Sequence, residues 1–278
     1  MKLGKVAVLL VAVCVASVLV GACTLLRPTT VPMPSTTYGG GGVGNCLLVM
    51  LPGRASRPGD FANNGFISTL REAGFDAQVV TADAHVGYYR KGTLIERLRN
   101  DVVEPARMKS QRKVFLVGIS LGGTGAILYA RAHPEDVCGV LLIAPFLGSR
   151  ETVEEVTAAG GLAAFEPPWR TGKRFERDVW EWLKASTSQT SPAIPIYLGY
   201  GAEDDLATAH RLLAAALPPD HVFTVAGGHD WRAWRAVWAE FLRSPALACG
   251  GCSGGYASPA ASLLQSQHAE HGAMGTRR

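Results

Sequence analysis

The chain has 278 residues, of which 47% are hydrophobic and 18% are charged, a composition close to that of an ordinary globular protein. This balance excludes wholesale disorder and a small disulfide-dense scaffold. Only one stretch is long and apolar enough to cross a bilayer, which excludes a protein with several membrane spans. The formal net charge is only +4. Because nucleic-acid binding usually needs a clustered basic face, no nucleic-acid partner is expected.

The N-terminus has the layout of an export signal. Two lysines precede an uncharged apolar run over residues 6–20, and the small residues of Val20-Gly21-Ala22-Cys23 follow. That tetrapeptide resembles the lipobox of bacterial lipoproteins, whose cysteine is lipidated and becomes the new N-terminus. We therefore expect a signal peptide over residues 1–22 and a Cys23 that carries acyl chains such as palmitate. An uncleaved anchor helix with an incidental Cys23 is the alternative.

A lipid on Cys23 would attach the protein to a membrane of the cell envelope. The inner-membrane retention signal of enteric bacteria has Asp after the cysteine, whereas Thr24 stands here, which favours the outer membrane.

Export also places the other cysteines in an oxidising compartment. Cys249 and Cys252 either close a small disulfide loop or remain thiols, and Cys138, which opens an apolar run, is expected to be a buried small hydrophobe.

Composition divides the remaining chain into one domain with two flanking segments. Residues 23–44, rich in Pro, Thr and Gly, are expected to form a flexible tether. Residues 244–278, rich in Ala, Gly and Ser, are expected to be a largely disordered tail. Between them, residues 45–243 alternate short apolar runs with amphipathic stretches. The apolar runs predict about six strands, over residues 46–51, 77–81, 114–118, 137–144, 194–200 and 221–226.

The stretches between these runs have helical spacing. In the clearest of them, three tryptophans and a phenylalanine recur on one face, at Trp231, Trp234, Trp238 and Phe241, which is typical of a helix packed on a core. Alternating strands and helices predict an α/β fold with a mostly parallel sheet and helices on both faces. Ligands of such folds bind beyond the carboxyl ends of the strands. The chemistry is therefore expected in the turns that follow the strands.

One of these turns carries a G-x-S-x-G motif, Gly118-Ile119-Ser120-Leu121-Gly122, between an apolar run and a helix-compatible stretch. A sharp strand-to-helix turn of this kind strains the serine backbone, and its glycines remove Cβ atoms that would clash. The hydroxyl then stands at a helix N-terminus, where free N–H groups favour developing negative charge. Ser120 is thus the expected nucleophile, and a glycine-rich turn without chemistry is the alternative.

A serine nucleophile needs a base, and the best candidate is His229. It lies in Gly227-Gly228-His229-Asp230-Trp231, after the last expected strand, where the glycines allow a close approach to the serine. His85 follows an earlier apolar run and could line the pocket. The histidines at 210 and 221 lie inside a helix and at the start of a strand, so a structural or solvated role is expected for them.

The third group should be a carboxylate that holds the imidazole tautomer and stabilises the imidazolium. Glu203, Asp204 and Asp205 follow the run over 194–200 and compete for this role. For any one of them a solvated helix N-cap is the alternative. Asp230 is adjacent to the histidine, which makes an orienting side-chain contact awkward.

The chain order Ser, Asp, His together with G-x-S-x-G resembles the α/β-hydrolase superfamily over about residues 45–243. The resemblance implies an α/β-hydrolase fold whose acid follows a strand as G-x-x-D, here Gly201-Ala202-Glu203-Asp204, which favours Asp204. It also implies an oxyanion hole made by the N–H of Leu121 and an N–H from the loop after the first core strand, by position that of Arg54. No cofactor and no metal is implied.

Members of that superfamily often carry a cap, which the resemblance places at about residues 148–192. Its aromatic residues are expected to bury the cap onto the core, with an acyl or aromatic pocket as the alternative. These residues are Phe165, Trp169, Phe175, Trp180 and Trp182.

The implied function is that of a serine hydrolase whose partner is a small-molecule carboxylic ester or thioester. Two alternatives are open: a non-catalytic envelope lipoprotein that uses the fold for binding, and a peptidase or acyltransferase on the same triad.

Overall fold

The computed structural model describes residues 27–39, 47–110, 113–166, 174–188 and 194–247. The predicted signal peptide, Cys23, Cys249 and Cys252 lie outside these ranges. Within them, no helix is long and apolar enough to cross a membrane.

The described chain forms a sheet of seven strands in the order β1-β3-β2-β4-β5-β6-β7. All neighbours are parallel except β1 and β3, which are antiparallel. The six runs predicted as strands are confirmed, and one edge strand is added. The strands are β1 (Ser35–Tyr38), β2 (Leu47–Leu51), β3 (Gln78–Ala82), β4 (Val114–Ile119), β5 (Val137–Ile143), β6 (Ile196–Gly201) and β7 (Val222–Val225).

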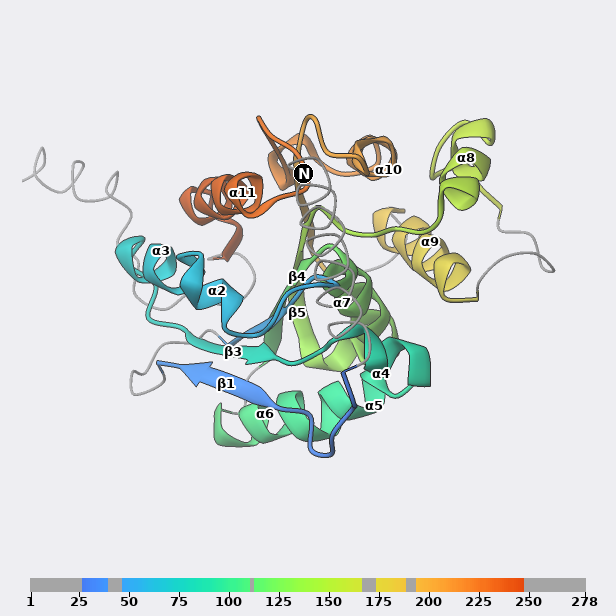
Figure 1. The fold of residues 1–278 in the computed structure, drawn as a ribbon. Coiled ribbons are helices and arrows are strands. Elements are labelled where there is room, and N and C mark those ends of the chain that lie inside the picture. The colour runs from blue at the N-terminus through green and yellow to red at the C-terminus, as the bar shows by residue number, and fades with distance from the viewer. Residues whose placement is uncertain (1–26, 40–46, 111–112, 167–173, 189–193, 248–278) are drawn as a thin grey trace, which may run out of the picture.

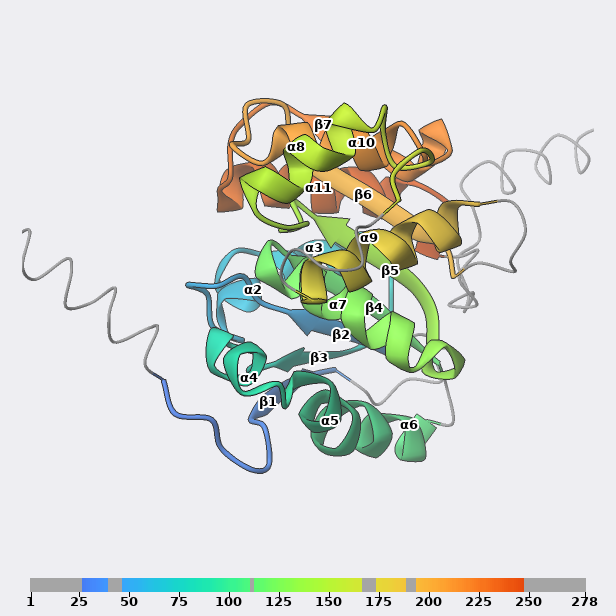
Figure 2. The ribbon, with the colours of Figure 1, turned by 90° about the vertical axis from the view of Figure 1, so that its right-hand side faces the viewer.

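Helices cover both faces of the sheet, as Figures 1 and 2 show. One face carries α2 (Asp60–Asn63), α3 (Phe66–Glu72) and α11 (Trp231–Arg243). The other carries α4 (Val86–Lys91), α5 (Leu94–Leu98), α6 (Glu104–Ser110), α7 (Leu121–Ala132), α8 (Arg150–Ala158), α9 (Arg174–Thr187) and α10 (Ala207–Ala214). Short π and 3-10 turns add η1 (Arg99–Val103), η2 (Pro134–Asp136) and η3 (Pro219–His221).

Coverage on both faces explains the nearly continuous apolar runs. Every residue of β2 and of β4 is buried. In β2, Leu47, Val49 and Leu51 pack on the α7 face, whereas Leu48 and Met50 pack on the α11 face. Successive side chains of a strand point to opposite faces, so a strand with two covered faces needs an apolar residue at every position.

The segment predicted as a flexible tether over residues 23–44 is instead part of the domain where it is described. Ser35–Tyr38 pairs with β3, from Ser35 opposite Ala82 to Tyr38 opposite Val79. Met33 is buried, and its N–H donates to Asp101 Oδ2 at 2.7 Å. The tether prediction is therefore wrong for residues 27–39. It failed because β1 is polar and largely exposed, which leaves no apolar signal.

The predicted cap region supplies two helices, α8 and α9, that pack beside the α7 face. Trp180 of α9 is fully buried, and Phe165 is 4% exposed and meets its ring edge-on at 6.5 Å. Burial of the cap aromatics onto the core is thus confirmed for these two, while Trp169 lies outside the described residues. The predicted disordered tail begins too early, because Ala246 and Leu247 are buried.

Packing of the N-terminal segment yields a stability test. Met33→Ala should lower the free energy of unfolding by about 2–4 kcal/mol, because it empties a buried site. Met108 is 82% exposed, so the matched change Met108→Ala should alter stability by less than about 0.5 kcal/mol. Urea unfolding of the three proteins measures both values. Equal, small effects would show that residues 27–39 do not pack on the domain in solution.

Candidate active site

The turn between β4 and α7 holds Ser120 in a strained backbone. Its φ is +53° and its ψ −116°, a region that non-glycine residues rarely occupy. Hydrogen bonds hold it there: its N–H donates to Ile143 O at 2.9 Å, and its carbonyl accepts the N–H of Phe146 at 3.0 Å. A Cβ on Gly118 would collide with the carbonyl of Gly122, and one on Gly122 would collide with Leu51 O. The strained turn and the need for both glycines, predicted from the motif, are confirmed.

His229 reaches Ser120 from the loop between β7 and α11. Its Nε2 lies 2.9 Å from Ser120 Oγ, and its Nδ1 lies 2.9 Å from Asp204 Oδ2. The indole of Trp234, on the first turn of α11, meets the imidazole edge-on at 5.1 Å. The three groups expected from chain order are thus in one hydrogen-bonded line.

The structure separates the competing carboxylates. Asp204 is buried, and its second oxygen accepts the N–H of Leu206 at 2.8 Å. Glu203 accepts the N–H of Gly227 instead. Asp230 caps α11 by accepting the N–H groups of Arg232 and Ala233 at 2.8 and 3.0 Å. Asp205 is exposed beside the site. Of these four carboxylates, only Asp204 is hydrogen-bonded to the imidazole.

Asp204 is kept ionised by its hydrogen bonds. Burial alone would raise its pKa, but the bonds from His229 and from the Leu206 N–H outweigh burial, so the pKa of Asp204 lies below its ordinary value. An ionised carboxylate accepts a hydrogen bond from the Nδ1–H of His229. This tautomer leaves Nε2 without a proton, so Nε2 can take the proton of the serine.

Two further side chains support the site without a distinctive sequence signal. His210 of α10 is fully buried, and its Nε2 lies 2.9 Å from Pro145 O, next to the backbone that braces Ser120. Burial lowers the pKa of His210 to about 4, so it is neutral and adds no charge beside Asp204. Tyr89 donates to Leu121 O at 2.9 Å, and burial raises the pKa of its hydroxyl. The sequence predicts His210 inside a helix with a structural or solvated role, and the structure gives it a structural one.

A cleft of about 570 Å³ opens over the serine and is called the Ser120 cleft below. The loop over residues 53–56, Val86, Phe146 and Trp234 form its walls. Trp234 is therefore both a core residue, as predicted, and a wall of the site. His85, which could have lined the pocket, is buried and caps α4 by accepting the Gly87 N–H at 3.1 Å.

Both residues expected to form the oxyanion hole line this cleft. Leu121 begins α7, and the first N–H groups of a helix have no acceptor inside it. On the opposite side, a Cβ on Gly53 would lie 3.4 Å from Ser120 Cβ, so the loop that carries Arg54 lies directly against the serine.

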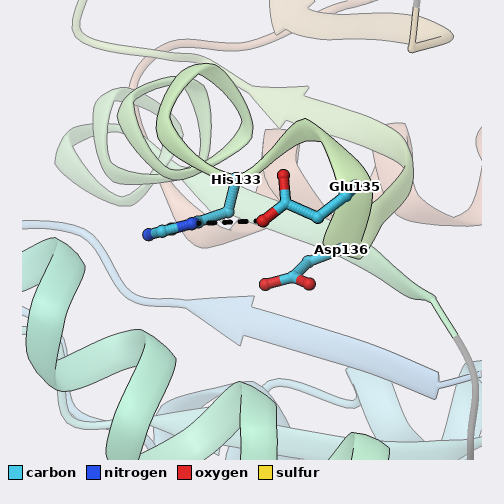
Figure 3. A group of neighbouring side chains, drawn as sticks. All are labelled: His133, Glu135 and Asp136. Atoms are coloured by element: carbon cyan, nitrogen blue, oxygen red, sulfur yellow. Dashed lines mark ion pairs between the residues drawn. The ribbon is translucent and has the colours of Figure 1, made fainter.

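A cluster of His133, Glu135 and Asp136 lies directly before β5, at the amino end of that strand and away from Ser120 (Figure 3). His133 Nδ1 is 3.5 Å from Glu135 Oε1. Asp136 is already held by Arg107 and by the hydroxyl of Tyr129, the latter at 2.8 Å. Its carboxylate is thus engaged by a cation and a donor, and the cluster is explained by these contacts without a metal.

Comparison with known proteins gives both a family and a fold. A family model described as "Putative esterase" matches residues 88–243. No curated protein sequence matches the chain.

Similar solved structures include S-formylglutathione hydrolase FrmB from Staphylococcus aureus, with TM-score 0.51 and 13% identity over 78% of this chain and 97% of that one. Rv0554 from Mycobacterium tuberculosis has TM-score 0.52 and 15% identity over 77% and 93%. Est1E from Butyrivibrio proteoclasticus, solved with ferulic acid, has TM-score 0.50 and 16% identity over 77% and 96%. The expected α/β-hydrolase fold is confirmed.

The line from Asp204 to Ser120 gives a first catalytic test. Asp204→Asn should place the imidazole in the wrong tautomer and lower kcat on p-nitrophenyl acetate by up to about 10⁴-fold. Asp220 is an exposed carboxylate in η3, at the opposite end of the sheet, so Asp220→Asn should keep full activity. Initial rates and thermal melting of both variants separate lost catalysis from unfolding. Near-normal turnover in Asp204→Asn would contradict this assignment.

Proposed function

We propose that this chain, which belongs to the Esterase family over residues 88–243, cleaves a small-molecule carboxylic ester or thioester through an acyl-enzyme on Ser120. Family membership makes the protein an ester hydrolase of the serine type. The observation that carries the mechanism is the pair of 2.9 Å hydrogen bonds that join Ser120, His229 and Asp204. A module that only binds its ligand has no need of these three groups in line.

Acylation begins when His229 Nε2 takes the proton of Ser120 and the serine oxygen attacks the carbonyl carbon. The carbonyl oxygen gains the negative charge, which the main-chain N–H groups of Leu121 and Arg54 would stabilise. Asp204 stabilises the imidazolium through Nδ1. The tetrahedral intermediate collapses, the bond to the leaving oxygen or sulfur breaks, and His229 gives that atom the proton.

Deacylation repeats these steps with water as the nucleophile. His229 takes a proton from water, the hydroxide attacks the acyl carbon, and Ser120 leaves with the returned proton. Overall, water and an ester yield a carboxylic acid and an alcohol, so no cofactor is required.

Loss of the nucleophile tests the proposal directly. Ser120→Ala should abolish labelling by a fluorophosphonate probe. It should also lower the rate of ester hydrolysis to at most about 10³-fold above the rate in water, because only the oxyanion hole and substrate binding would still contribute. Ser68→Ala is the matched control, because Ser68 is exposed and its hydroxyl donates to Gly65 O at 3.1 Å, a bond within its own turn. Undiminished turnover in Ser120→Ala would refute the serine mechanism.

We further propose that Cys23 anchors the enzyme to a membrane of the cell envelope, with the domain on the periplasmic or outer-membrane side. The support is the sequence Val20-Gly21-Ala22-Cys23 after an uncharged apolar run. Each buried CH₂ of an acyl chain contributes roughly 0.8 kcal/mol, and stable attachment takes two such chains.

The anchor is tested by mass. Cys23→Ser should remove the acyl mass, and the protein should either remain unprocessed or be released from membranes. Cys138→Ser should change neither the acyl mass nor the membrane attachment. Cys138 lies in β5, and burial raises the pKa of its thiol to about 11, which leaves the thiol unreactive. Intact-mass analysis of membrane-extracted protein measures the difference. Wild type without added acyl mass would exclude the anchor.

A further inference from the structure

A second cleft, of about 710 Å³, adjoins the Ser120 cleft and is called the Asp205 cleft below. It lies between α8 and α10, which contact each other and lie side by side in Figure 2. Phe146 lines both clefts. Since the backbone N–H of Phe146 donates to Ser120 O at 3.0 Å, the residue that the two clefts share lies beside the nucleophile.

The wall of the Asp205 cleft is fixed by a buried carboxylate. Glu176 of α9 is 2% exposed and accepts the N–H of Ser149 at 3.0 Å and its hydroxyl at 2.9 Å. The hydroxyl of Thr152 donates to the same oxygen. These bonds pin the start of α8 to α9, so the cleft is preorganised.

The Asp205 cleft has a net negative charge. Arg150 and Glu154 on its rim pair with each other at 2.7 Å, which cancels their charges. Asp205 remains, exposed and with no hydrogen bond or ion pair to another residue of the described ranges. The Ser120 cleft has the opposite charge balance: among its lining residues in the described ranges, Arg54 is the charged one besides the triad.

We propose that the Asp205 cleft binds the alcohol part of the substrate and selects esters in which that part carries a quaternary or primary ammonium group. The inference rests on the proposed esterase function and names its substrate class. A cation there would gain the Coulomb attraction of Asp205 and a contact with the ring of Phe146. Arg54 would repel it from the oxyanion side.

We assign the alcohol to this side from the path of the proton. The leaving oxygen must approach His229 Nε2 to receive its proton. Asp204, which holds that imidazole, is followed directly by Asp205 in the same loop. The acyl carbonyl must point the other way, toward the loop of Arg54. With the carbonyl on the Arg54 side, the proposal directs the alcohol part past Phe146, which lines both clefts, into the Asp205 cleft.

Charged esters and their neutral isosteres of equal shape test this selection. Butanoylcholine is compared with 3,3-dimethylbutyl butanoate, and the butanoate of 6-(trimethylammonio)hexanol with that of 7,7-dimethyloctanol, so that two linker lengths are covered. Wild type should show about a fivefold higher kcat/KM for the cationic ester at one or both lengths, chiefly through a lower KM. Because Asp205 is exposed, the preference should shrink between 0.02 and 0.5 M salt.

Variants connect the preference to the cleft. Asp205→Asn should remove most of the preference, Asp205→Glu should retain it in part, and Phe146→Leu should reduce it while keeping an apolar wall. Asp220→Asn should leave it unchanged. Thermal melting and fluorophosphonate labelling confirm that each variant is folded and has an intact nucleophile.

Two results would overturn the inference. One is a wild-type enzyme that labels with fluorophosphonate and hydrolyses p-nitrophenyl acetate but shows no preference for the cation at either length. The other is a preference that survives in both Asp205→Asn and Phe146→Leu. Failure of labelling and of all ester turnover would instead refute the proposed function itself.

Discussion

The positive φ of Ser120 is the constraint on which the rest of the site depends. A non-glycine residue in such a region costs of order 1–3 kcal/mol and persists only when its surroundings hold it there. Here the carbonyl of Ser120 accepts the N–H groups of Gly123 and Phe146, at 2.9 and 3.0 Å, and its own N–H is bound by Ile143. The end of the neighbouring strand β5 is strained in the same way, because Ala144, which follows it, also has a positive φ, of +46°. The two strained turns interlock and direct the hydroxyl out of the sheet.

Charge in the site is concentrated where the reaction requires it. Asp204 is kept anionic by donors, whereas His210, which is more deeply buried, is kept neutral by burial. A second cation at His210 would compete with the imidazolium of His229 for the same carboxylate. A neutral ring that only holds the carbonyl of Pro145 gives support without that competition.

Sequence patterns predicted the parts of this molecule that depend on local chemistry. The central strands β2 and β4 are buried at every position because both faces of the sheet are covered, so the sequence predicts each of them to within one residue. The G-x-S-x-G turn was found because close approach leaves no room for Cβ atoms. Strand β1 was missed because an edge strand with three exposed positions has no such pattern. The Asp205 cleft was missed because α8 and α10 are far apart in the sequence, and only the fold brings them together.

The acidic run Glu203-Asp204-Asp205 shows why spacing alone could not assign the triad. The backbone turns within it: the N–H of Glu203 bonds Gly227 O, and that of Asp204 bonds Gly201 O, both at 3.1 Å. Each successive side chain therefore leaves in a different direction.

The three carboxylates accordingly have three roles. Glu203 bonds the loop to the segment that carries His229, Asp204 enters the site, and Asp205 faces the neighbouring cleft. Three like charges are tolerated in one loop because each has a different environment: a backbone donor, an imidazole and open solvent. The same loop can thus hold the catalytic base in place on one side and present a free charge to the substrate on the other.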